Sequence, residues 1–236
     1  MAKVIIFSGA GISAESGIST FRSSDGLWEE YDVNVVCNYD SLDKNEDITI
    51  DFYDKRRSEL ENKHPNYAHK LIAELKKKYS NEISIITQNV DNLFEKAGLK
   101  EEDVLHLHGS LTQLSCRQCK EIYDVGYKKL HEYNDGLCNS CGSKLRPNIV
   151  FFGEQAPMYE NLNNEIQDCE FIVVIGTSGT VVGVNTMAAF IENSILNNLE
   201  PSDAIDDTLF KKVLYSKATE SIAEIVEDIE NFLKKS

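Results

Sequence analysis

Two Cys-x-x-Cys pairs constrain the fold of this chain more than any other part of its sequence. The first pair is Cys116 with Cys119, the second is Cys138 with Cys141, and 18 residues separate them. This spacing is typical of sites in which four thiolates bind one zinc ion. Four thiolates complete a tetrahedral shell and leave no position for water or substrate, so we expect a structural zinc ion. A redox-active pair is the alternative, but that chemistry needs only one such motif.

Length and charge narrow the class of protein further. With 236 residues, the chain can bury about 70 to 75 % of its unfolded surface, which suffices for one large domain without disulfides. The formal net charge of −15 argues against nucleic acid or an anionic membrane as a partner, because both require clustered Lys and Arg. The apolar runs are much shorter than the ~20 residues that span a bilayer. We therefore expect a cytoplasmic protein with reduced thiols, and the absence of long terminal extensions favours a monomer.

Short β-branched runs alternate with helical patterns along most of the chain. The runs predict buried parallel strands at Val4–Phe7, Ile83–Thr87, Ile149–Phe152 and Phe171–Ile175. Apolar residues at helical spacing predict helices over Ala68–Tyr79 and Ile222–Leu233. Strands that alternate with helices favour an α/β fold with a doubly wound, Rossmann-like parallel sheet.

Two stretches break this alternation, one charged and one rich in cysteine. They lie at about residues 28–65 and 111–147. We interpret them as insertions that form a smaller lobe, the first helical and the second a zinc ribbon. The Rossmann-like lobe then comprises about residues 1–27, 66–110 and 148–236. Because the chain crosses between the lobes repeatedly, we treat it as a single domain.

The first predicted strand runs into a glycine-rich turn within "SGAGISAESGISTFRSSDGLW". Gly9, Gly11 and Ala14 fit the dinucleotide fingerprint, in which glycines let the backbone approach a pyrophosphate at a helix N-terminus. The pattern is weak by itself, and a plain strand-to-helix turn is the alternative. A hydride-transfer enzyme usually carries an acidic residue after its second strand. Here a long apolar and cationic segment through Arg22 and Trp28 follows instead, which favours another reaction at an enclosed nicotinamide ribose.

Polar side chains follow the second predicted strand. Gln88, Asn89 and Asp91 come directly after Thr87, at the edge where ligands bind in open α/β sheets. A helix N-terminus capped by Asn89 or Asp91 is the alternative.

Two histidines alternate with leucines in "VLHLHGSL". On a strand, His106 and His108 would point to the same face. A histidine that titrates near neutrality suits general-base catalysis. For His106 a buried structural role is the favoured interpretation.

Taken together, these motifs resemble the sirtuins, which are NAD-dependent protein lysine deacylases. In order, they are "GAGISAESGISTFR", "TQNVDNL", "HLHGSL", the paired cysteines, "RPNIVFFGE" and "GTSG". The resemblance covers nearly the whole chain and implies NAD as co-substrate, structural Zn²⁺ and acylated lysines of proteins as substrates. A further stretch, "DFYDKRRSELE", resembles the Tyr-x-x-Arg segment of bacterial and mitochondrial sirtuins that remove negatively charged acyl groups.

The resemblance also implies roles for individual residues. His108 is expected to act as general base for the ribose hydroxyls of NAD, with Asn89 positioning the ribose or a water. The products would be free lysine, nicotinamide and an O-acyl-ADP-ribose. The expected NAD-binding residues are Gly9, Ala10, Gly11, Ser13, Phe21, Arg22, Trp28, Gln88, Asn89, Val90, Asp91, Gly176, Thr177, Ser178, Asn198, Leu199, Glu200 and Ala218. The segment with Val150, Phe152, Gly153 and Glu154 would form the acyl-lysine tunnel and pair with substrate as an added strand.

Tyr53 and Arg56 match the Tyr and Arg of the acid-acyl segment. At a spacing of i to i+3 they would share a helix face, where a phenol and a guanidinium can bind a succinyl or malonyl carboxylate. The alternative is an exposed basic helix in which Arg56 pairs with Asp54 or Glu59.

Some positions depart from the family pattern. Phe94 stands where the family usually has His, and Ser19 where it has Pro. The stretch Ala189–Asn198 looks several residues too short for the usual helix, turn and strand, and loss of that strand would weaken NAD binding. The alternative functions are deacetylation without acid-acyl preference, ADP-ribosyl transfer or NAD hydrolysis, dehydrogenation, and a non-catalytic zinc-ribbon interaction.

Overall fold

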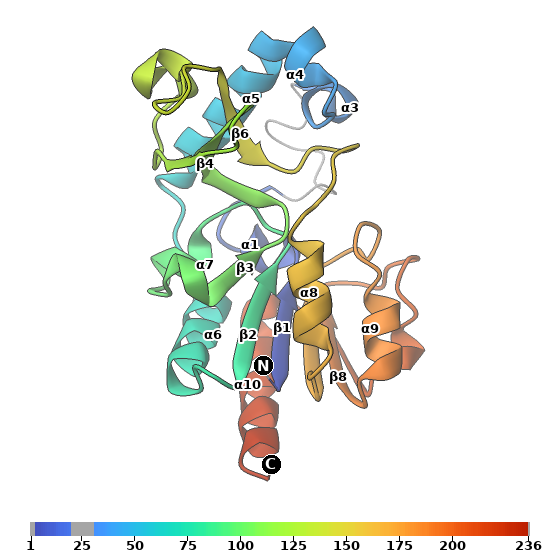
Figure 1. The fold of residues 1–236 in the computed structure, drawn as a ribbon. Coiled ribbons are helices and arrows are strands. Elements are labelled where there is room, and N and C mark those ends of the chain that lie inside the picture. The colour runs from blue at the N-terminus through green and yellow to red at the C-terminus, as the bar shows by residue number, and fades with distance from the viewer. Residues whose placement is uncertain (1–2, 20–30, 236) are drawn as a thin grey trace.

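Six parallel strands form the larger sheet of the molecule (Figure 1). The structure, a computed structural model, describes residues 3–19 and 31–235. The strand order is β3-β2-β1-β7-β8-β9. Their bounds are β1 Val4–Ser8, β2 Ile83–Thr87, β3 Val104–His106, β7 Phe171–Ile175, β8 Asn193–Asn198 and β9 Lys212–Tyr215. The order reverses between β1 and β7, as in dinucleotide-binding folds, so the predicted Rossmann-like fold is confirmed.

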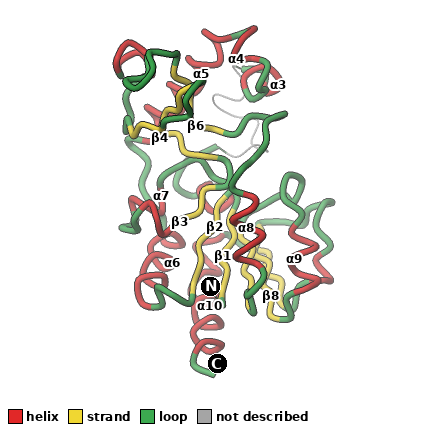
Figure 2. The backbone as a smooth tube through the Cα atoms, viewed as in Figure 1, coloured by secondary structure: helices red, strands yellow, loops and turns green. Residues whose placement is uncertain are grey.

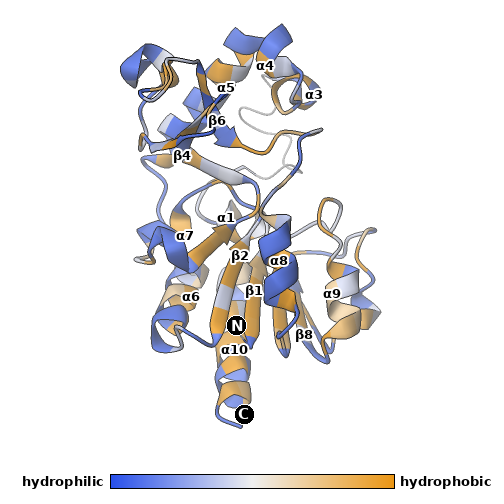
Figure 3. Cartoon of the chain, in the orientation of Figure 1, coloured by the Kyte–Doolittle hydropathy of each residue, from blue (hydrophilic) through white to orange (hydrophobic). Residues whose placement is uncertain are grey.

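Helices cover both faces of this sheet (Figure 2). One face packs against α6 and α10, the other against α8 and α9. Their bounds are α6 Tyr67–Lys78, α8 Tyr159–Ile166, α9 Val184–Phe190 and α10 Ala218–Leu233. Val4 and Ile6 of β1 face α6 and α10, whereas Ile5 and Phe7 face α8 and α9. Figure 3 shows β1 and β2 as strongly hydrophobic, as expected for parallel strands buried on both sides.

The two helices predicted from periodicity are present as α6 and α10. Asn66 caps α6, because its Oδ1 accepts a hydrogen bond from the backbone N–H of Ala68 at 3.0 Å. The last turn of α6 carries Lys76–Lys78, whose positive charges suit the negative end of the helix dipole. Among the helices of residues 3–19 and 31–235, none is long and apolar enough to cross a membrane.

A second sheet has three antiparallel strands in the order β5-β4-β6. The bounds are β4 Gly109–Cys116, β5 Ile122–Asp124 and β6 Leu145–Ile149, and the helices beside them are α3 Val33–Val36, α4 Ser41–Lys44 and α5 Glu46–Leu60. The remaining short elements are α1 Gly11–Ala14, α7 Leu93–Lys96, and the 3₁₀ turns η1 Glu101–Asp103, η2 Leu130–Glu132, η3 Asn134–Gly136 and η4 Asp207–Leu209. This sheet, with α3 to α5, lies beyond the carboxyl ends of the parallel strands (Figure 1).

One predicted strand belongs to the other sheet. Ile149–Phe152 was expected in the parallel sheet, but β6 ends at Ile149 and pairs antiparallel with β4, where Ile149 lies opposite Gly109. The prediction is wrong because an apolar run shows that a strand is buried without showing which strand is its neighbour. Phe152 instead forms an isolated bridge with Asn38.

The short stretch before Asn198 still contains its strand. Helix α9 ends at Phe190, and β8 begins at Asn193, so only two residues connect them. The stretch is therefore short because the helix and the turn are short, while the strand is kept. The strand is therefore present, and the condition under which NAD binding was expected to weaken is not met.

Candidate active site

The turns after β1 and β7 are in direct contact. Gly9 N–H donates to Ile175 O at 2.9 Å, and Gly11 N–H donates to Gly176 O at 2.8 Å. A Cβ atom on Gly11 would lie 2.6 Å from the Cα of Gly176, which is closer than van der Waals contact permits. Glycine is therefore required for the backbone of one turn to lie against the other, at the point where the strand order reverses.

A buried polar cluster joins the first turn to the end of β2. The hydroxyl of Ser13 donates to Asp91 Oδ2 at 2.9 Å and accepts from Asn89 Nδ2 at 3.1 Å. Asp91 Oδ1 also accepts from Leu93 N–H at 3.1 Å, although the N-cap residue of α7 is Asn92. Burial raises the pKa of Asp91, while these hydrogen bonds oppose the shift. Three expected NAD-binding side chains are thus held together.

Gln88 connects the same strand end to the turn after β7. Its Nε2 donates to Thr177 Oγ1 at 2.8 Å. Asn198 forms a reciprocal pair with the backbone of Thr177: its Oδ1 accepts from Thr177 N–H at 3.1 Å, and its Nδ2 donates to Thr177 O at 2.9 Å. The buried amide of Asn198 therefore supports the Thr177 turn. The two residues that follow, Leu199 and Glu200, are exposed, and Ala218 lies buried at the start of α10.

His108 lies just beyond β3, where the chain passes from one sheet to the other. Its Nδ1 is 3.0 Å from Gln88 O, and its Nε2 is 3.0 Å from the hydroxyl of Tyr159. Because a carbonyl oxygen only accepts, Nδ1 carries the proton and Nε2 offers a lone pair. Burial lowers the pKa of His108, and the carbonyl of Gln88 opposes the shift only in part. The ring is therefore neutral at pH 7, as a general base must be.

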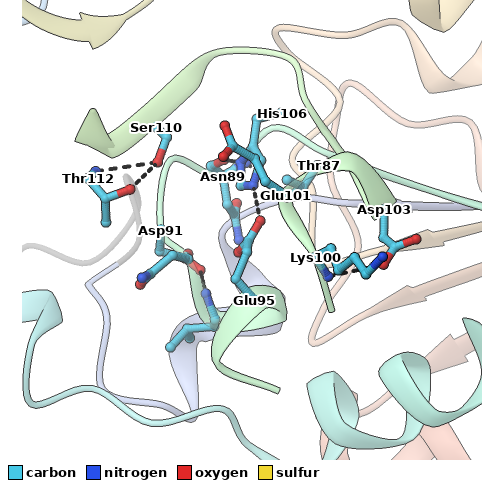
Figure 4. Close-up of polar contacts among 12 residues, drawn as sticks. Thr87, Asn89, Asp91, Glu95, Lys100, Glu101, Asp103, His106, Ser110 and Thr112 are labelled. Atoms are coloured by element: carbon cyan, nitrogen blue, oxygen red, sulfur yellow. Dashed lines mark hydrogen bonds and ion pairs between the residues drawn. The ribbon is translucent and has the colours of Figure 1, made fainter. Parts of the chain in front are cut away.

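His106 has a different environment (Figure 4). Its Nδ1 is 2.9 Å from Asn89 O, and its Nε2 is 2.8 Å from Glu95 Oε1. Burial opposes protonation, but the hydrogen bond and charge of Glu95 outweigh it and raise the pKa of His106. Glu95 belongs to α7 and Tyr159 to α8, which pack on opposite faces of the sheet, so the two histidines do not share a face. His106 is a structural support for Asn89.

Tyr53 and Arg56 lie on α5, which packs against the smaller sheet. Tyr53 is 4 % exposed, its hydroxyl donates to Cys37 Sγ at 3.7 Å, and its ring packs edge-on against Phe151 at 5.2 Å. The guanidinium of Arg56 lies over the ring of Phe52, with 5.5 Å from its carbon to the centroid. Burial raises the pKa of Tyr53, and the charge of Arg56 opposes that shift. Burial lowers the pKa of Arg56, and the charges around it, including that of Asp91, oppose that shift.

The expected acyl-lysine segment is held from both sides. Arg146 donates to both carboxylate oxygens of Glu154, at 2.5 and 2.7 Å, and Phe151 N–H donates to Glu154 Oε2 at 2.9 Å. The backbone of Phe152 is paired with residues 37–39, since its N–H donates to Cys37 O and its carbonyl accepts from Tyr39 N–H. An added substrate strand can use Phe152 only if that bridge opens. Gly153, the next residue, has a left-handed φ of +90°.

The four cysteines of the paired motifs meet in one cluster. All four Sγ atoms lie within 4.8 Å of one another, with 3.4 Å between Cys116 and Cys141 and 3.6 Å between Cys119 and Cys138. Tetrahedral zinc with Zn–S bonds of about 2.3 Å would place the sulfurs about 3.8 Å apart. Backbone N–H groups of Gln118 and Cys119 also point at Cys116 Sγ, both at 3.4 Å. The cluster therefore fits a structural zinc site.

The sequence model of the Sir2 family matches residues 9–183. The chain belongs to the Sir2 family. A curated relative of this Sir2 chain from Campylobacter jejuni, named NAD-dependent protein deacylase, is 47 % identical over 235 residues, covering 99 % of this chain and 98 % of the relative.

Solved structures of Sir2 homologues agree with the fold of this Sir2 chain. A complex of one homologue with ADP-ribose has a TM-score of 0.84 at 31 % identity, covering 99 % of this chain and 94 % of the other. A complex of a Sir2 homologue with NAD has a TM-score of 0.83 at 32 % identity, covering 98 % and 90 %. Sirtuin membership is thus confirmed, with NAD as co-substrate.

Three of the expected NAD-binding residues are not described by the structure, and two residues near the site were not expected from the sequence. Phe21, Arg22 and Trp28 lie outside the described residues of this Sir2 chain. Sequence reasoning missed Tyr159, because nothing near it repeats or matches a motif. It also missed Arg146, although "RPNIVFFGE" places an arginine eight residues before Glu154, where an ion pair across a turn is possible.

Proposed function

We propose that this Sir2 chain, an NAD-dependent protein lysine deacylase, prefers acyl groups that end in a carboxylate, such as succinyl and malonyl. Family membership and the relatives named NAD-dependent protein deacylase support the activity itself. The position of Arg56 beside Tyr53, on the helix that packs against Phe151, supports the preference. This position is the observation that carries the proposal.

The roles proposed for the site residues follow from their geometry. When bound, NAD would supply a ribose carbon from which nicotinamide can leave and a ribose hydroxyl that takes over the acyl group, and a water would balance the release of free lysine. His108 would accept the proton of a ribose hydroxyl at Nε2, because Gln88 O holds the proton of the ring on Nδ1. Ser13, Asn89 and Asp91 would bind the nicotinamide end. The products are free lysine, nicotinamide and an O-acyl-ADP-ribose.

The zinc site has no part in that chemistry. Cys116, Cys119, Cys138 and Cys141 would supply four thiolates to the ion. A shell of four protein ligands leaves no position for water or substrate, so the ion stabilises the smaller sheet.

Arg56 is suited to bind a carboxylate at the end of an acyl chain. A guanidinium stays charged at any physiological pH and binds carboxylates through charge-assisted hydrogen bonds. Of the two acidic residues considered as partners, Asp54 is in an ion pair with Arg57, and the charge of Glu59 acts on Arg56. The hydroxyl of Tyr53 currently donates to the thiol of Cys37, which is a weak acceptor. Exchange of that thiol for a carboxylate oxygen would strengthen the hydrogen bond.

The substitution Arg56→Met tests the acyl preference. We expect the rate of desuccinylation to fall on the order of 10- to 100-fold more than the rate of deacetylation, as the loss of a hydrogen bond to a charged group predicts. Mass spectrometry of succinyl- and acetyl-lysine peptides incubated with NAD measures both rates. Lys55→Met is the matched control, because it removes an exposed charge from the neighbouring residue. An equal loss of both activities in Arg56→Met would refute the preference.

The same assay tests the activity. His108→Ala should abolish acyl removal, and wild type should release nicotinamide only with an acylated peptide. Acyl removal without NAD would contradict the proposed reaction. Nicotinamide release without peptide would favour an ADP-ribosyltransferase or NAD hydrolase.

The proposed setting of the enzyme is the cytoplasm, as a monomer without nucleic acid or membrane as a partner. The net charge of −15 supports this, because phosphate-rich partners are repelled by an acidic surface. The division into lobes at about residues 28–65 and 111–147 also stays a prediction.

A further inference from the structure

We propose that Tyr159 caps the general base of the free enzyme: its hydroxyl donates a hydrogen bond to Nε2 of His108 and occupies the place that a ribose hydroxyl of NAD takes in the reaction. The inference rests on the proposed role of His108. It assigns Tyr159 as a positioning residue that must withdraw before the base can act.

The direction of this hydrogen bond follows from its neighbours. Nδ1 of His108 faces the carbonyl oxygen of Gln88 at 3.0 Å and must donate to it. In the neutral ring, Nε2 is then an acceptor, so the hydroxyl of Tyr159, at 3.0 Å, is the donor. The rings are tilted by 47° with centroids 6.0 Å apart. The contact is therefore a directed hydrogen bond and not a ring stack.

Neither His108 nor Tyr159 is charged in this hydrogen bond, so the bond can be broken at little cost. For His108, the groups of the described chain that shift its pKa are its buried surroundings and the carbonyl of Gln88. For Tyr159, burial alone raises the pKa of the phenol, so its hydroxyl keeps its proton. A neutral hydrogen bond of this kind can be exchanged for one from a ribose hydroxyl at little cost.

The place of Tyr159 in the chain connects this cap to the acyl-lysine segment. Tyr159 is the first residue of α8, and only residues 155–158 separate it from Glu154 of that segment. Phe152 is bound to the backbone of Cys37 and Tyr39, and Gly153 has a φ of +90°. When substrate displaces the bridge at Phe152, the same stretch of chain can draw Tyr159 away from His108. Binding of acyl-lysine and release of the base are thereby coupled.

A titration of His108 tests the cap without relying on activity. We expect Tyr159→Phe to raise the pKa of His108 by about 0.5 to 1 unit, because loss of the donor to Nε2 destabilises the neutral ring. NMR of the imidazole protons measures this, with the His108 signal assigned by its absence in His108→Ala. Tyr215→Phe is the control, since it removes a phenol hydroxyl that donates to Asp207 and not to His108. An unchanged pKa in Tyr159→Phe would overturn the proposal.

Kinetics with an acylated peptide provide the second test. With the competing hydroxyl removed, we expect the KM for NAD to fall about 2- to 10-fold, as the loss of one neutral hydrogen bond predicts, while kcat is unchanged. A large fall in kcat at constant KM would make Tyr159 a proton relay and overturn the cap. If wild type shows no NAD-dependent turnover, the proposed function fails, and the titration still decides whether the cap exists.

Discussion

His69 is a fully buried histidine beside the polar cluster of Ser13, Asn89 and Asp91. Its Nδ1 is 3.0 Å from Asn66 Oδ1, which also accepts from the backbone of Ala68, so Nδ1 must be the donor. Its Nε2 is 3.4 Å from the hydroxyl of Ser13. Burial lowers the pKa of His69 to about 4. The neutral ring therefore supports Ser13, and its protonation would disturb the cluster around Asp91.

The pKa of His69 predicts part of the acid sensitivity of the fold. In the unfolded chain the pKa is about 6.5, so the unfolded state takes up this proton first, and stability falls as the pH drops from about 6.5 to about 4. The contribution lost is about 3 kcal/mol. Between about pH 6.5 and about pH 4, the free energy of unfolding of His69→Gln, measured with urea, should fall by about 3 kcal/mol less than that of wild type. His64→Gln, at an exposed position, is the control, and equal pH dependence in all three proteins would contradict the prediction.

Residues were predictable where their chemistry depends on spacing along the chain. The four cysteines and the glycines of the first turn are identified by spacing, because the metal and the close turn both fix it. Tyr159 could not be found in this way, since its contact with His108 depends on how α8 packs against the sheet. The same applies to the hydrogen bonds of Asn198 with the backbone of Thr177, which depend on how β8 lies beside β7.

Helix α5 is joined to the smaller sheet by a buried ion pair. The side chain of Arg57 is fully buried, pairs with Asp54, and donates to Leu111 O at 2.5 Å. Asp54 in turn accepts from Leu130 N–H at 3.0 Å. Burial disfavours both charges, lowering the pKa of Arg57 and raising that of Asp54. Each charge therefore depends on the other.

Removal of one partner should cost more than removal of both. Arg57→Leu leaves Asp54 buried without its cation, and we expect the free energy of unfolding to fall by about 3 to 5 kcal/mol. The double variant Asp54→Leu/Arg57→Leu should be more stable than Arg57→Leu alone. Chemical denaturation of Arg57→Leu, Asp54→Leu, the double variant and wild type completes the cycle. Losses that add up from the two single variants to the double variant would show that the pair is not coupled.

Elements were predicted well where the periodic pattern was long. The helices α6 and α10 and the strands β1, β2 and β7 were all expected close to their observed bounds. β6 was assigned to the wrong sheet, because its neighbour β4 is set by the crossing of the chain near His108. The presence of β8 was left open by the sequence, because the strand follows α9 after only two residues and no separate turn signal marks its start.

At the scale of the whole molecule, the two sheets have separate hydrophobic cores of very different size. The parallel sheet is packed on both faces by large clusters of buried side chains. The smaller sheet packs on two smaller clusters. One lies against α5 and includes Phe52, Leu111 and Ile149; the other lies around the cysteines, and its buried members are Ile50, Leu114, Cys116, Val125, Leu130, Cys138 and Leu145. The cluster around the cysteines is not expected to stay folded without its metal.

Removal of zinc should therefore unfold one part of the molecule and spare the other. After treatment with a chelator, we expect backbone amides of β4, β5 and β6 to lose protection from hydrogen exchange, while those of β1, β2 and β7 keep it. Deacylase activity should be lost as well, because β4 and β6 position the segments on either side of His108. Cys116→Ser should behave like the chelated protein, and Cys169→Ser, outside the cluster, like wild type. Retained protection of β4 after chelation would contradict the structural role of zinc.

The order of strands in the parallel sheet has a consequence for the synthesis of the protein on the ribosome. β1 is made first, yet it lies between β2 and β7, and β7 begins at Phe171, after the last strand of the smaller sheet has ended at Ile149. The growing chain thus completes its zinc-binding part while β1 still has one side uncovered. We therefore expect that, when zinc is available, the zinc-binding part can begin to fold before β7 is made.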